Sequence, residues 1–168
     1  MVEFFCPGIG RPKGSKRLVR TRRGRTLMLE DSKREKPWSA SVAFAAGVAM
    51  AGRDRFASTP LAVLMVFGFV RPAKHYTAMG LRPDAPVWHT AKPDASKLAR
   101  SVEDALNGVV WDDDSRVARL SVSKPYVELD QLPGVAVAVA RAGEEAWIHD
   151  EDEDSFYRRV AAVLERRR

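Results

Sequence analysis

Apolar residues occur along the chain in short runs whose spacing predicts strands. Residues 2–6 are mostly apolar and aromatic and precede a Pro-Gly pair, which predicts a first strand that ends in a turn. Residues 61–70 are apolar throughout, as expected of a central strand covered on both faces. Further strands are expected at residues 117–122, where polar and apolar residues alternate, and at residues 135–140, with Pro133-Gly134 turning the chain between them.

Other segments have the apolar spacing of helices. Residues 38–51 are rich in alanine and follow Pro37, which suits the first turn of a helix. After Pro93, apolar residues recur at helical spacing up to an Asn-Gly pair that tolerates a left-handed cap. The expected core positions are Leu98, Val102, Ala105 and Leu106 in this central helix, and Phe156, Val160, Val163 and Leu164 in a final helix.

Two polar regions separate these elements. Residues 9–25 are rich in Gly, Pro, Ser, Lys and Arg, which predicts a basic loop, and residues 26–29 can pair as a second strand that closes a hairpin over it. Residues 71–90 contain several prolines and are expected to form a long loop. With 168 residues and 45% hydrophobic content, we expect a single domain over residues 1–168 of the α/β (α+β) class, in which helices pack on a mixed sheet.

Charge and composition narrow the partners and the setting. Lys and Arg number 28 against 22 Asp and Glu, so the formal charge of +6 favours a polyanionic partner such as nucleic acid or an anionic membrane surface. Cys6 is the only cysteine, which excludes an intrachain disulfide and a cysteine-based zinc site and suits a reducing cytoplasm. No apolar run is long enough to cross a bilayer, and residues 1–10 do not resemble a signal peptide, so we expect a cytoplasmic protein with no membrane partner.

Cations in both loops are candidates for contact with nucleic acid. Lys13, Lys16 and Arg17 lie in the basic loop, which lacks the spacing of a nucleotide-binding P-loop. They either contact a phosphate backbone or belong to a solvated loop. In the second loop Lys74, with Arg71, His75 and Tyr76 beside it, either reaches nucleic acid through charge and stacking or is part of an ordinary surface loop; His75 alone is a poor catalytic candidate. 

Carboxylates flank the central helix. Asp94 precedes it, and the run of Asp112, Asp113 and Asp114 follows it. Phosphodiester hydrolysis needs an activated water and stabilised charge on the phosphate, and Mg²⁺ held by carboxylate oxygens supplies both. Alternatively Asp94 caps the helix by accepting the amide of Ser96 or Lys97, and the aspartate run is a polar turn. Convergence of these carboxylates depends on the tertiary fold.

The same residues resemble a known family. Lys92-Pro93-Asp94, Leu98, Arg100, the block from Asp104 to Gly108 (DALNG) and the block from Asp113 to Val117 (DDSRV) are similar to the signature of the RusA family of Holliday junction resolvases. Residues 7–17 (PGIGRPKGSKR) resemble the family's N-terminal loop, and residues 124–135 its closing strand region.

This resemblance implies an Mg²⁺-dependent endonuclease, for which Mn²⁺ can substitute, that acts as a homodimer on branched DNA. It would resolve four-way junctions by paired nicks in recombination and repair, and small resolvases of this type are often encoded by phages and prophages. The family's essential acids fall at Asp94, Ser96 and Asp114, and a family lysine falls at Arg100. The expected metal ligands are Asp94 and Asp114 with help from Asp113, and Lys97 adds a cation for DNA.

The chain departs from the family pattern at two of these positions. Ser96 replaces an aspartate, so one anionic contact is missing, and Arg100 is a permanently charged fork better suited to clamping phosphate than to moving protons. Asp113 or Asp104 would supply the lost carboxylate, or Ser96 would orient a metal-bound water. The substitution leaves a second hypothesis, a junction- or duplex-binding protein with weak or no catalysis on the same fold. A third is a nuclease directed at RNA.

Overall fold

The structure is a computed structural model that describes residues 1–12, 16–20, 26–30, 35–144 and 152–165; side chains are described for 1–12, 36–144 and 152–162. The strands are β1 (Val2–Pro7), β2 (Lys16–Arg20), β3 (Thr26–Glu30), β4 (Leu61–Val70), β5 (Tyr76–Thr77), β6 (Gly80–Leu81), β7 (Val117–Ser123), β8 (Tyr126–Val127) and β9 (Gly134–Arg141). The helices are α1 (Glu35–Ala49), α2 (Ala95–Leu106) and α4 (Glu153–Glu165), with short 3-10 helices η1 (Ala73–His75) and η2 (Asp114–Arg116).

A mixed five-stranded sheet forms the centre of the molecule. Its order is β1-β9-β4-β7, and β8 pairs with the end of β4. β9 runs antiparallel to both β1 and β4, whereas β4 and β7 are parallel. The chain connects these parallel strands through α2, because parallel neighbours require a crossover. β4 is therefore interior, and its first eight residues are buried, as the sequence predicted for a strand covered on both faces.

The predicted turn at Pro133-Gly134 does lead into β9, but β7 and β9 are not neighbours, since β4 lies between them.

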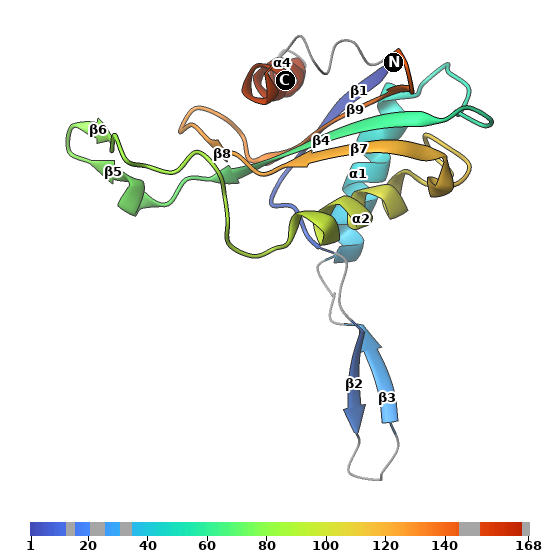
Figure 1. The fold of residues 1–168 in the computed structure, drawn as a ribbon, viewed down its shortest axis with the longest axis horizontal. Helices are drawn as coiled ribbons and strands as arrows, with labels where there is room; N and C mark the ends of the chain where they lie inside the picture. Colours follow the sequence, from blue (N-terminus) through green and yellow to red (C-terminus); the bar gives the residue numbers. More distant parts are fainter. Residues whose placement is uncertain (13–15, 21–25, 31–34, 145–151, 166–168) are drawn as a thin grey trace.

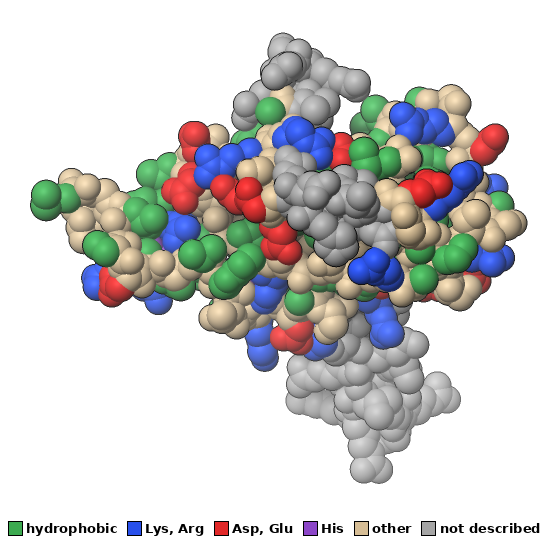
Figure 2. Space-filling view, turned by 45° about the horizontal axis from the view of Figure 1, so that its top comes forward, with side chains coloured by type: hydrophobic (Ala, Val, Ile, Leu, Met, Phe, Trp, Pro, Cys, Tyr) green, Lys and Arg blue, Asp and Glu red, His purple; other side chains and the backbone are tan. Residues whose placement is uncertain are grey.

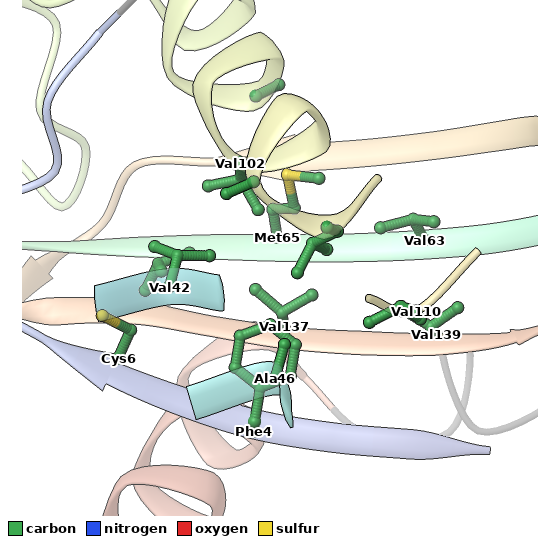
Figure 3. Close-up of a cluster of buried hydrophobic side chains, with 14 of the residues drawn as sticks. Phe4, Cys6, Val42, Ala46, Val63, Met65, Val102, Val110, Val137 and Val139 are labelled. Atoms are coloured by element: carbon green, nitrogen blue, oxygen red, sulfur yellow. The ribbon is translucent and has the colours of Figure 1, made fainter. Parts of the chain in front are cut away.

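The larger core lies between the sheet and the helices α1 and α2. Val42 and Ala46 from α1 and Val102 from α2 meet inward-facing residues of β1, β4 and β9, including Met65 and Val137 (Figure 3). The core positions predicted for the central helix are all buried, and Gly108 ends that helix with a φ of 78°. The hydrophobic spacing of this helix therefore predicted its orientation correctly.

The opposite face of the sheet is covered by α4 (Figure 1). Phe156, Tyr157 and Val160 pack on Phe5 and on the second face of β4 and β9. The Tyr157 hydroxyl donates a 2.6 Å hydrogen bond to the carbonyl of Leu132. The predicted C-terminal helix is confirmed, and the side chains of Val163 and Leu164 lie outside the described residues.

The strand expected at residues 26–29 is present as β3, and the other strands of the two polar regions were missed by the sequence analysis. β3 pairs antiparallel with β2, which lies within the basic loop, and this two-stranded ribbon extends away from the sheet on the side of α1 and α2 (Figure 1). Within residues 71–90, β5 and β6 form a small hairpin after η1. Short strands among Gly, Pro and cations give no apolar run, so the pattern did not reveal them. No helix in the described ranges is long and apolar enough to cross a membrane.

Candidate active site

Asp94 lies at the position preceding the first turn of α2. Its side chain makes no capping hydrogen bond, so the expectation that it accepts the amide of Ser96 or Lys97 is wrong. The carboxylate instead lies 3.3 Å from the Lys97 ammonium group, and both side chains are about half exposed. An exposed pair of this kind contributes little to stability, because water screens the charges. The Asp94 carboxylate is therefore accessible and takes no part in capping the helix, whereas the Asp94 carbonyl accepts the amide of Leu98.

Lys124 fixes the segment that leads into Asp94. Its ammonium group donates hydrogen bonds of 3.0 Å to the Ala91 carbonyl and 2.8 Å to the Pro93 carbonyl. The Lys92-Pro93 peptide bond between these acceptors is cis. Because Lys124 follows β7, which adjoins β4, the start of α2 is tied to the sheet. The sequence analysis gave Lys124 no role in the site.

One face of α2 brings together Ser96, Arg100 and Glu103. These residues lie at positions i, i+4 and i+7, which place side chains on the same side of a helix. Partial burial raises the pKa of Glu103, and the negative charges of Asp114 and Asp104 raise it further, while the charge of Arg100 acts in the opposite direction. Glu103 was not proposed from the sequence as a site residue, although its spacing from Ser96 and Arg100 was visible there.

The aspartate run is divided among different interactions at the start of η2. Asp113 accepts a 2.8 Å hydrogen bond from the amide of Ser115, and its hydrogen bonds with Ser115 hold the pKa of Asp113 below its ordinary value. Asp112 lies 3.4 Å from Arg55. Asp114 is exposed. The polar-turn interpretation thus describes Asp113, whereas the negative charge of Asp114 acts on Glu103 in α2.

Asp94 and Asp114 have different partners on α2. Asp94 pairs with Lys97, whereas Asp114 acts on Glu103, which lies about 13 Å further along the helix axis than Asp94 at roughly 1.5 Å per residue. In the described part of the chain, no group of three or more His, Cys, Asp and Glu side chains is arranged to hold a metal ion. Ser96 and Arg100 lie on α2 between Asp94 and Glu103. Asp94, Asp113 and Asp114 therefore form no metal-holding group within the described residues.

A cleft of about 490 Å³ opens beside Asp94. Its walls come from the N-terminal loop, the end of β4, the segment before α2 and the first turn of α2. The cations Arg11, Lys92 and Lys97 line it together with Asp94. Cations that surround a carboxylate in an open cleft can hold a phosphate group against it, since each of them attracts the phosphate charge. The roles of Arg11 and Lys92 were not predicted, because their distance in the sequence gives no sign that they share a cleft.

Phe69 and His89 form an aromatic wall of the same cleft. Their rings stack with centroids 3.9 Å apart and an interplanar angle of 6°. Burial lowers the pKa of His89, and the positive charge of Lys124 lowers it further. A neutral imidazole stacked on phenylalanine offers a flat surface that suits a nucleobase or sugar.

The remaining nucleic-acid candidates have mixed outcomes. Lys97 lines the cleft, and Lys74 is exposed on η1. Lys13 lies outside the described residues, as do the side chains of Lys16 and Arg17, whose backbone belongs to β2.

Arg71 and His75 are structural, which corrects the expectation that they reach nucleic acid. Both are buried, and Arg71 donates a 2.7 Å hydrogen bond to the Pro86 carbonyl and lies over the Tyr126 ring. His75 packs edge-on against the same ring. Burial lowers the pKa of His75, as do the charges of Arg71, Lys74 and Arg82. These side chains hold the loop of residues 71–90 in place.

The face of the molecule toward α4 differs in charge from the cleft beside Asp94. On the face toward α4, Lys and Arg side chains are interspersed with Asp and Glu (Figure 2). The cleft beside Asp94 differs, because its cations outnumber its single acid.

Comparison with known families agrees with this geometry. Residues 9–140 match the family described as Endodeoxyribonuclease RusA, and this match covers most of the chain. The chain belongs to the RusA family. The match includes the N-terminal wall of the cleft, all of α2 and the aspartate run, and it ends in β9. The resemblance seen in the sequence and the mixed α+β fold are confirmed.

A shorter match is found in Bacillus subtilis (strain 168). The chain is 49% identical over 39 residues to the uncharacterized protein YqaN, which corresponds to 23% of this chain and 28% of that protein. The likeness therefore spans less than a third of the relative's length. The description of the RusA family names an endodeoxyribonuclease. The cationic cleft lies within the residues that match this family.

Proposed function

We propose that the protein is a metal-dependent endonuclease that resolves four-way DNA junctions by paired nicks. The observation that carries this proposal is the cleft beside Asp94, in which Arg11, Lys92 and Lys97 surround a carboxylate at the start of the family's central helix. A scissile phosphate drawn to these cations would lie next to Asp94. The whole chain would act as a single nuclease domain in the cytoplasm, and a phage or prophage origin would suit such an enzyme.

The expected metal is Mg²⁺, with Mn²⁺ as a substitute. Asp94 and Asp114, assisted by Asp113, would hold it, which requires that the bound metal draw these carboxylates closer together than they lie within the described residues. All three are exposed carboxylates, and hard divalent ions prefer such oxygens. Partial burial raises the pKa of Glu103, and the negative charges of Asp114 and Asp104 raise it further, which supports placing a cation between α2 and η2. When bound, the metal supplies an activated water and neutralises charge on the phosphate.

Glu103 is the strongest candidate to replace the carboxylate that is missing at Ser96. It lies on the same stripe of α2 as Ser96, and the charge of Asp114 acts on it directly. Asp113 already accepts a hydrogen bond from the Ser115 amide, so it is assigned only the assisting role. Ser96 would then position water by hydrogen bonding, and Arg100 would hold the phosphate from the neighbouring turn.

Binding of branched DNA would extend beyond the cleft. Lys13, Lys16 and Arg17 would contact the phosphate backbone along the basic ribbon, and Lys74 would contact it from η1. A homodimer would present symmetry-related sites to symmetry-related strands of a junction, which would account for paired nicking.

One observation favours a second candidate, a junction- or duplex-binding protein with little catalysis. Ser96 is a neutral hydroxyl, and within the described ranges no three potential ligands are close together. The decisive experiment incubates purified protein with Mg²⁺ and a labelled synthetic four-way junction, a matched linear duplex and a structured RNA.

We expect nicks in junction DNA alone. A shift in mobility without nicks, together with activity gained by Ser96→Asp, would establish the binding protein, and preferential cutting of RNA would contradict both.

A further inference from the structure

A narrow arm projects from the end of the sheet beside the candidate site. It consists of residues 71–88, which include η1 and the β5–β6 hairpin, and it extends beyond β8 at one end of the molecule (Figure 1). The chain leaves the cleft beside Asp94 at Phe69 and returns to it at His89, since both residues line that cleft. The arm is therefore an outgrowth of the cleft wall.

The root of the arm is fixed to β8. The Tyr126 amide donates a 2.9 Å hydrogen bond to the Val87 carbonyl, and the buried side chains of Arg71 and His75 lie against the Tyr126 ring. The Arg82 amide donates a 3.0 Å hydrogen bond to the His75 carbonyl, which joins the two sides of the arm below the hairpin. An arm built in this way holds its tip at a defined position.

The tip of the arm is a two-residue turn, Ala78-Met79, between β5 and β6. The Thr77 hydroxyl donates a 3.2 Å hydrogen bond to the Gly80 carbonyl and accepts one of 3.2 Å from the Met79 amide, so the backbone of the turn is ordered. The Met79 side chain is 98% exposed, the highest value among the large hydrophobic residues of the described ranges. Burying this side chain in a partner would be favourable, because it now faces water.

Further hydrophobic side chains are exposed on the same arm. Leu81, Val87 and Trp88 are all exposed, and hydrophobic atoms cover the free end of the arm (Figure 2). A single exposed hydrophobic residue needs no explanation, but several on one protruding segment indicate a binding surface.

Charge favours DNA as the partner of this surface. Residues 71–92 contain four Lys and Arg residues and one acid, Asp84, which pairs with Arg82 at 3.0 and 3.1 Å. Lys74 is exposed on η1 at the root of the arm, and Lys92 lines the cleft. The arm thus combines an uncharged apolar tip with a basic root. A single turn is also too small for a stable protein interface, which buries about 800 Å² on each partner.

We propose that the arm is a wedge that inserts the Met79 side chain between bases at the branch point of the DNA junction. Proteins that bend or open DNA use apolar side chains in this way, and methionine is one of them. This inference deepens the proposed function and rests on it, because it takes branched DNA as the substrate and names the contact that recognises the branch.

The branch point is the place where such a wedge costs least. Parting two stacked base pairs in a continuous duplex costs a few kcal/mol, whereas stacking between the arms of a junction is already interrupted. Bases exposed by the wedge can stack on an exposed aromatic side chain, and Trp88 is available on the same arm. Met79 therefore gives the protein a preference for junctions over linear duplex, while the cations of the cleft attract phosphates in both.

The first test measures base stacking at the branch point. The protein is titrated into synthetic four-way junctions that carry 2-aminopurine at each branch-point position in turn, with Ca²⁺ in place of Mg²⁺ so that binding is measured apart from nicking. The fluorescence of 2-aminopurine rises when the base loses its stacking partners. The wild type should raise the fluorescence at one position or more, Met79→Ala should lose most of that rise, and Met79→Leu should keep it, because leucine is also an apolar wedge.

Leu129→Ala is the matched control for the loss of an exposed apolar side chain. Leu129 is 81% exposed but lies outside the arm between two acids, Glu128 and Asp130, so DNA has no reason to approach it. This variant should keep the wild-type fluorescence and affinity. An equal loss in Leu129→Ala and Met79→Ala would overturn the proposal.

The second test separates the wedge from phosphate contact. Met79→Ala should weaken junction binding about 10-fold, the loss expected when one buried methionine side chain is removed, and should leave binding of linear duplex unchanged. The slope of log binding constant against log salt should also stay unchanged, because Met79 contacts no phosphate. Lys74→Ala should instead reduce that slope by about 0.9 if Lys74 contacts one phosphate.

The outcomes distinguish the wedge from its alternatives. A wild type that binds the junction without a rise in fluorescence, or an equal rise in Met79→Ala, would overturn the wedge. Junction signals that Met79→Ala leaves unchanged, together with an altered assembly state in sedimentation velocity, would assign the tip to a protein contact and overturn it as well. A rise that depends on Met79, in a protein that does not nick junctions with Mg²⁺, would refute the nuclease and leave the wedge intact.

Discussion

Lys124 offers the sharpest test of how the fold positions the candidate site. Replacing it with methionine keeps the length and apolar stem of the side chain but removes the charged donor. The Ala91 and Pro93 carbonyls then lose the hydrogen bonds that fix the segment before Asp94. The matched control is Lys36→Met, the same change at an exposed position on α1.

The magnitude follows from these contacts. Hydrogen bonds to a charged group contribute about 1.5–3 kcal/mol each, but carbonyls near the surface regain water and the half-buried ammonium no longer has to be desolvated. We therefore expect a loss of about 1–2 kcal/mol in the free energy of unfolding, or roughly 2–8 °C in Tm for a chain of this size. Because a displacement of about 1 Å in an active site can reduce the rate by roughly 100-fold, nicking should fall by about 10- to 100-fold.

The assay combines thermal unfolding, single-turnover nicking of a four-way junction and a titration of His89 by NMR. Since the charge of Lys124 helps to lower the pKa of His89, Lys124→Met should raise that pKa toward its ordinary value. Wild-type values of Tm, nicking rate and His89 pKa in the variant would refute this account of the segment. A loss equal to that in Lys36→Met would also count against it.

Further predictions concern packing, charge and DNA contact. Gly134→Ala should cost about 1–3 kcal/mol in urea unfolding, because the new methyl group overlaps the backbone carbonyl of Cys6, which cannot move aside. Because the pKa of Glu103 is raised in the folded state, the free energy of unfolding should fall as pH rises from the unfolded-state pKa of Glu103 through its folded-state pKa. Asp114→Asn should lower the Glu103 pKa in an NMR titration, and an unchanged pKa would show that the charge of Asp114 does not act on Glu103. Arg11→Ala should reduce the slope of log binding constant against log salt by about 0.9 if Arg11 contacts one phosphate, and an unchanged slope would remove it from the interface.

Local patterns predicted most of the core elements. The apolar run of β4 and the helical spacing of α2 each identify an element, because burial on both faces or on one stripe leaves a direct trace in the sequence. The β2 strand was missed because its residues, KRLVR, are largely cationic and its pairing is with β3 alone among the described strands.

Site residues were harder to predict when their partners are distant in the chain. The family resemblance singled out Asp94 and Asp114, but the link between Glu103 and Asp114 depends on how η2 meets α2. Arg71 and His75 looked like surface cations by composition, yet the fold buries them around Tyr126. Sequence spacing cannot distinguish such tertiary contacts from solvent exposure.

The most direct test of the central claim compares the wild type with Asp114→Asn on a synthetic four-way junction. The two side chains have nearly the same shape, and Asp114 is exposed, so folding and junction binding should be preserved. We predict that the wild type nicks the junction only when Mg²⁺ is present and that Asp114→Asn binds the same junction but does not nick it. An Asp114→Asn variant that cuts at the wild-type rate would contradict a catalytic site at α2 and η2.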